Sequence, residues 1–132
     1  MITVEQYFIT RTHTLEQEYN AIDLLTRVNA LMEEYTLSTG RSVPINKSTG
    51  SQISGATEGG FRLPTCTQGA TNSSHKEAKA VDVYDPDEGL DNWITRTILV
   101  KYDLYREHPD YTHGWCHLTT RQPKSGTRTF IP

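Results

Sequence analysis

The segment SSHKEAKAVDVY, residues 73–84, passes from a polar loop into a strand with two different faces. Val81 and Val83 alternate with Asp82, so one face of the strand is apolar and the other carries a carboxylate. His75 lies seven residues before Asp82, in the loop that feeds the strand. The segment therefore predicts a strand that packs on a core with one face and presents metal-ligand side chains on the other.

A second strand with the same alternation is expected at residues 115–119, WCHLT, where His117 points away from its neighbours Cys116 and Leu118. Imidazole nitrogen and carboxylate oxygen bind Zn²⁺, and two histidines with one acid leave a fourth tetrahedral position open. If the two strands are neighbours, His75, Asp82 and His117 form a catalytic zinc site. The alternative is that these residues do not converge, since a lone histidine is more often a surface residue.

The chain before residue 40 predicts helices. A short helix is expected up to Phe8 with Thr3 as its cap, and TLEQ at residues 14–17 fits a capping box. Apolar residues then recur at three-and-four spacing, which indicates one buried helix face. These residues are Ala21, Leu24, Leu25, Val28, Leu31, Met32 and Tyr35. Gly40 is the expected stop.

The remainder predicts short strands and one further helix. Strands are expected near residues 42–46, 53–56, 59–62 and at the end of segment 122–130. A helix after Asp85 would bury Leu90, Trp93, Ile94 and Ile98, and a loop is expected after Tyr105. This order predicts a single α+β domain over residues 1–132, with N-terminal helices packed on a small antiparallel sheet.

Composition excludes several classes of function. The chain has 132 residues and a net charge of −3, without the basic excess typical of nucleic-acid binders. No apolar run is long enough to cross a bilayer, and the first residues show no secretory signal. We therefore expect a protein that does not bind nucleic acid, has no transmembrane segment, is monomeric and is made in the cytoplasm.

Three segments carry a resemblance to a known family. The pattern Ser73-x-His75-x-x-Ala78-x-Ala80-x-Asp82 resembles the Ser-x-His-x-x-Gly-x-Ala-x-Asp motif of the D-alanyl-D-alanine carboxypeptidase family of zinc peptidases. That family is related to the hedgehog signalling domain and to phage endolysins. GGFRLP at residues 59–64 is similar to its Ser-Gly-Tyr-Arg-Pro segment, and WCHL at residues 115–118 lies where the family has its last zinc ligand.

The resemblance implies a fold, a metal and a substrate. It implies zinc held by the predicted triad, with Arg62 near the substrate carboxylate or the carbonyl under attack. It places Ser73 and Trp115 beside the same cleft, where they would position the peptide. The implied activity is hydrolysis of stem or cross-bridge peptides of bacterial peptidoglycan by a phage or prophage lysis protein, made in the host cytoplasm and acting at the cell wall.

One departure from the family pattern affects catalysis. Many members have an acid three residues before the last zinc histidine, where it accepts a proton from water, and here that residue is Gly114. His113 and Asp110 are the nearest replacements, Glu107 is a further one, and the sequence does not choose among them. The alternative function is therefore a non-catalytic metal-binding module of a phage particle or of a protein complex.

Overall fold

The longest element is helix α2 (Leu15–Thr39), in a computed structural model that describes residues 1–69 and 72–132. The Thr14 side chain accepts a hydrogen bond from Gln17 N and completes the predicted capping box, and Gly40 ends the helix in the left-handed conformation at φ 72°. All seven predicted apolar residues of α2 are buried. Helix α1 (Val4–Phe8) is capped by Thr3, also as predicted. Within the described residues, no helix is both long enough and apolar enough to cross a membrane.

The sheet has four strands in the order β1-β3-β2-β4: β1 (Ala80–Tyr84), β2 (Tyr105–Glu107), β3 (Trp115–Thr119) and β4 (Thr129–Phe130). Strand β3 is antiparallel to β1 and to β2, but β4 is parallel to β2. The sheet is therefore mixed, and the prediction of an antiparallel sheet is wrong for its last strand. The chain reverses its direction after β3, so β4 runs opposite to β3. Strand β4 pairs with β2, which also runs opposite to β3, and β2 and β4 are therefore parallel.

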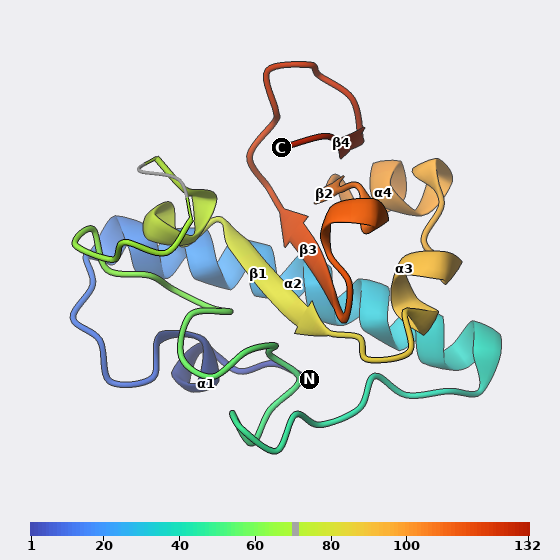
Figure 1. Cartoon of the computed structure of the whole chain (residues 1–132), viewed down its shortest axis with the longest axis horizontal. Helices are drawn as coiled ribbons and strands as arrows, with labels where there is room; N and C mark the ends of the chain where they lie inside the picture. The colour runs from blue at the N-terminus through green and yellow to red at the C-terminus, as the bar shows by residue number, and fades with distance from the viewer. Residues whose placement is uncertain (70–71) are drawn as a thin grey trace.

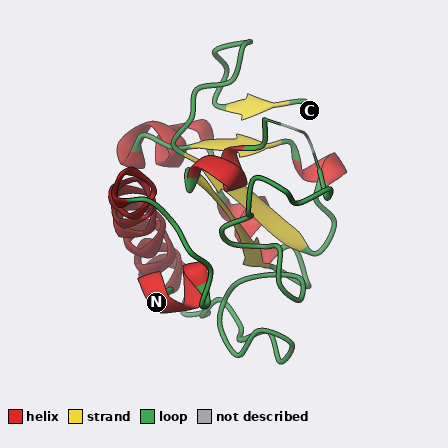
Figure 2. Cartoon of the chain, turned by 90° about the vertical axis from the view of Figure 1, so that its left-hand side faces the viewer, coloured by secondary structure: helices red, strands yellow, loops and turns green. Residues whose placement is uncertain are grey.

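Helix α2 lies against one face of this sheet, behind β1 and β3 (Figure 1) and to one side of the strands when the molecule is turned (Figure 2). Val81, Val83, Cys116 and Leu118 are fully buried members of the same core as the α2 residues. Because side chains alternate along a strand, Asp82 and His117 lie on the opposite face. The core thus fixes the face on which the polar residues gather.

The predicted helix after Asp85 is two helices, α3 (Gly89–Trp93) and α4 (Arg96–Tyr102). Ile94 is extended at the break, and the Thr95 side chain caps α4 by accepting a hydrogen bond from Ile98 N at 3.3 Å. The Asp85 carboxylate accepts from Leu90 N and Asp91 N at the start of α3. The sequence signal for this break is Thr95, a helix-capping residue that interrupts the apolar pattern.

The segments expected as strands near residues 42–46, 53–56 and 59–62 form no strand, and only Asn46 and Ile53 among them make isolated bridges. They nevertheless cover the outer edge of β1, because Ser54 N donates to Asp82 O and Asp82 N donates to Gly59 O, both at 2.8 Å. A Cβ on Gly59 would lie 2.2 Å from Ser54 O, so only glycine allows this close approach. The segment consequently runs directly beside Asp82.

Candidate metal centre

The two predicted histidines and the aspartate converge. Potential ligand atoms of His75, Asp82 and His117 all lie within 4.8 Å of one another. Asp82 Oδ1 is 3.3 Å from His75 Nε2 and 2.8 Å from His117 Nδ1. The predicted triad therefore forms one cluster, on the sheet face opposite α2.

His75 is held in place by a 3₁₀ turn, η1 (Ser74–Glu77), and by a backbone carbonyl. The Ser73 side chain caps this turn by accepting from His75 N at 3.2 Å. His75 Nδ1 lies 2.8 Å from Gly60 O, so donation to this carbonyl leaves Nε2 free to face Asp82. Ala78 ends the turn in the left-handed conformation at φ 58°, which explains why a glycine suits this position of the resembled motif.

Asp82 and His117 are brought together by strand register. They are directly opposite partners in the antiparallel pair β1–β3, so their side chains point to the same face of the sheet. Both side chains are 12% exposed. A shift of one residue in this register would move His117 to the other face, so the alternation of both strands determines the site.

The donor set fits zinc in kind and in spacing. Tetrahedral ligands about 2.1 Å from an ion lie roughly 3.4 Å apart, and the separations of 3.3 and 2.8 Å from Asp82 Oδ1 are close to this distance. Burial raises the pKa of Asp82, but the charge of His75 and hydrogen bonds from both histidines outweigh burial and hold it well below the usual carboxyl range. Asp82 is thus an ionised carboxylate between two imidazoles, which is the state in which a carboxylate binds a metal ion.

Arg62 lies against the same carboxylate. Its Nη2 is 3.6 Å from Asp82 Oδ2, the oxygen that does not face the histidines. Its Nε donates to Glu58 O at 2.8 Å and its Nη1 to Gln68 O at 3.4 Å, and only 13% of the side chain is exposed. Arg62 thus lies beside the triad, with its guanidinium held by backbone carbonyls.

Glu107 continues a row of side chains across the sheet. The β2–β3 register pairs Arg106 with Leu118, and its next step places Glu107 opposite His117. In the other direction Glu107 pairs with Phe130 of β4. Asp82, His117, Glu107 and Phe130 therefore share one face, and all four line the same hollow of about 590 Å³.

Burial raises the pKa of the half-buried Glu107, and the nearby Asp82 carboxylate raises it further, while His117 and His75 lower it. A carboxyl group with a raised pKa is a better proton acceptor when ionised than an exposed carboxylate of ordinary pKa. Glu107 therefore combines a suitable position with suitable chemistry for a general base.

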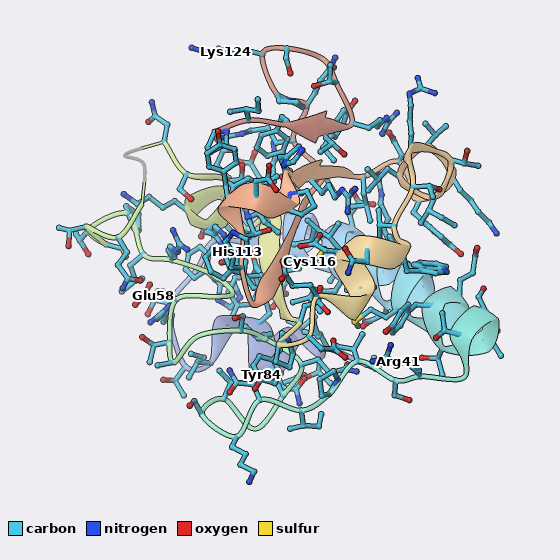
Figure 3. The ribbon with its side chains drawn as sticks, turned by 45° about the vertical axis from the view of Figure 1, so that its right-hand side comes forward. Arg41, Glu58, Tyr84, His113, Cys116 and Lys124 are labelled. Carbon is cyan, nitrogen blue, oxygen red and sulfur yellow. The ribbon has the colours of Figure 1, made fainter. Side chains whose placement is uncertain are left out.

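Two of the three candidate replacements for the missing acid, His113 and Asp110, lie away from the cluster. His113 is 72% exposed, lies on the turn before β3 (Figure 3), and its Nδ1 is 3.4 Å from Glu88 Oε1. Asp110 is 81% exposed and lies 3.6 Å from His108 Nδ1. Neither lines the hollow, whereas Ser73 and Trp115 both do, as expected. Glu107, the third candidate from the sequence, does line the hollow, and it lies on β2.

Comparisons with profiles of protein families, with curated proteins and with solved structures found no match to this chain. The function of the chain therefore has to be inferred from the site itself and from the motif resemblance.

Proposed function

We propose that this chain is a zinc-dependent peptidase of the D-alanyl-D-alanine carboxypeptidase and hedgehog type, acting on peptide bonds of bacterial peptidoglycan. The observation that carries the proposal is the convergence of His75, Asp82 and His117 beside Arg62 and Glu107 in one hollow. Three ligands leave a coordination position open, which is the arrangement of catalytic rather than structural zinc sites. The motif resemblance supports the two remaining parts of the proposal, a peptide substrate and a role in phage lysis.

In the proposed mechanism each residue of the site has its own role in hydrolysis. When bound, zinc supplies Lewis-acid chemistry, lowering the pKa of a coordinated water and polarising a carbonyl. Glu107 Oε takes the proton from the attacking water and returns it to the leaving amine. The Arg62 guanidinium stabilises the negative charge that develops on the carbonyl oxygen. The Gly60 carbonyl keeps His75 in the orientation in which Nε2 faces Asp82 and could bind the metal.

Purified peptidoglycan tests the activity directly. Zinc-loaded protein should release new amino groups from it, and a chelator should abolish the release. The His117→Ala variant, which lacks one ligand, serves as the matched negative control. Intact peptidoglycan at high concentrations of zinc-loaded protein would leave only the non-catalytic metal-binding module.

Glu107→Gln tests the assignment of the base. The amide keeps the size of the side chain but cannot accept the proton, so kcat should fall by about 10²- to 10⁴-fold while bound zinc per chain stays the same. His113→Ala and Asp110→Asn are matched controls and should keep nearly full activity, since both side chains lie away from the hollow. Full activity of Glu107→Gln would show that another group moves the proton.

A further inference from the structure

A second hollow adjoins the one that contains the cluster. It has a volume of about 250 Å³ and is formed mainly by residues 54–59, the segment that runs along the edge of β1. Arg62, Asp82 and Trp115 line both hollows. The two hollows therefore adjoin at these three residues, and we call them the smaller and the larger arm of one cleft.

The two arms of the cleft extend in different directions. Glu58 lines the smaller arm and Lys124 lines the larger, and the two side chains lie well apart on the molecule (Figure 3). An enzyme that removes one terminal residue needs a binding site that closes shortly after the scissile bond. A cleft that is open on both sides instead accepts a chain that continues in both directions.

The linings of the arms differ in charge. The smaller arm has small and hydroxyl-bearing residues such as Ala56 and Thr57. Glu58, a carboxylate that it does not share with the larger arm, is 3.0 Å from Arg11 Nη2. The larger arm adds the cations Arg121 and Lys124. Each arm thus offers contacts of its own to a peptide whose scissile bond lies over Asp82.

From these observations we infer that the enzyme cuts an internal peptide bond, with substrate residues bound in both arms, and does not release a single C-terminal residue. This inference rests on the proposed peptidase function. Binding energy gained far from the reacting bond positions it for attack, so substrates that fill both arms are cut faster than substrates that fill one.

Synthetic peptides of increasing length test the inference. Zinc-loaded protein is given peptides with one residue, or with several, after the scissile bond, and the products are identified by mass spectrometry. Peptides extended on both sides should be cut internally, with kcat/KM at least about tenfold higher. Release of a single terminal residue as the main product would overturn the inference.

Ala56→Trp tests the smaller arm, because Ala56 is exposed and lines it. The indole should lower kcat/KM for extended peptides by about tenfold or more, and lower it less for short ones. Ser38→Trp, at an exposed position of α2 outside both arms, is the matched control. Equal losses for long and short peptides would contradict the inference.

A binding measurement separates this inference from the proposed function. Calorimetry with zinc-loaded Glu107→Gln should show tighter binding of extended peptides than of truncated ones. In the double variant Glu107→Gln with Ala56→Trp, the extended peptides should bind more weakly than they do to Glu107→Gln alone. If no peptide is hydrolysed by the wild-type protein, the proposed function fails. If extended and truncated peptides bind equally, the two-armed cleft fails, whatever the result for hydrolysis.

Discussion

At the scale of single residues, the orientation of His75 depends on a glycine that the ligand motif does not include. Gly60 places its carbonyl 2.8 Å from His75 Nδ1, and an added Cβ at Gly60 would lie 2.6 Å from Tyr7 O. The neighbouring Phe61 N donates to the same Tyr7 carbonyl at 3.1 Å, so the two backbones are fixed close together. The ligand therefore relies on contact between α1 and the segment before the cleft.

We predict that Gly60→Ala lowers zinc affinity about 10- to 100-fold, because the backbone must move away from Tyr7 and takes the carbonyl from His75. Competition with a chromophoric chelator measures the affinity. Ser38→Ala, at an exposed position, should bind zinc like the wild-type protein. Unchanged affinity in Gly60→Ala would mean that the Gly60 carbonyl does not orient the ligand.

At the scale of elements, the short strand β2 has two functions, one on each face. Glu107 faces the cleft, while Arg106 faces the core side, where its Nη1 is 3.3 Å from Asp91 Oδ1. The Asp91 side chain is fully buried, and Arg106 Nε also donates to Thr129 Oγ1 at 3.1 Å. Arg106 thus joins β2 to α3 and to β4, and it holds the strand that carries the proposed base.

Arg106→Leu should destabilise the fold by about 3–5 kcal/mol, because it leaves the Asp91 carboxylate buried without its cation. Burial already raises the pKa of Asp91 and Arg106 lowers it, so the variant raises this pKa further. A carboxyl group whose pKa is higher in the folded state contributes stability at low pH and loses it as pH rises through that pKa. The deficit measured by urea unfolding should therefore be larger at pH 8 than at pH 5.

The double variant Arg106→Leu with Asp91→Asn is the control for this pH dependence, since it removes the ionisable group as well. Its unfolding free energy should differ from that of the wild-type protein by nearly the same amount at both pH values. If Arg106→Leu alone shows no dependence on pH, the ion pair with Asp91 is not what stabilises this junction.

At the scale of the whole molecule, the sequence predicted what depends on local pattern. Caps and periodicity predicted α1 and α2, alternation predicted β1 and β3, and the motif resemblance predicted that the triad converges. The sequence did not predict β2, because three residues are too few to show alternation, so it could not place Glu107 on the same face as His117. Nor did it predict the parallel pairing of β4 or the second arm of the cleft, which both depend on how distant segments lie side by side.

The last prediction concerns the coupling of zinc to the stability of the whole fold. The ligands come from η1, β1 and β3, so an ion bound to all three stabilises only the folded chain. At a free zinc concentration 100 times Kd, the gain is about 2.7 kcal/mol, which corresponds to a rise in Tm of roughly 10 °C for a domain of this size. Thermal unfolding followed by circular dichroism, with and without zinc, measures the rise.

Two variants give this measurement its controls. His117→Ala should show little or no rise, because it loses a ligand, and Glu107→Gln should show the full rise, because Glu107 acts on the water and does not bind the metal. If Glu107→Gln loses the rise, then Glu107 is a ligand and the base must be sought elsewhere in the cleft. If the wild-type protein shows no rise at saturating zinc, the cluster of His75, Asp82 and His117 is a hydrogen-bonded polar group of the fold and not a metal centre.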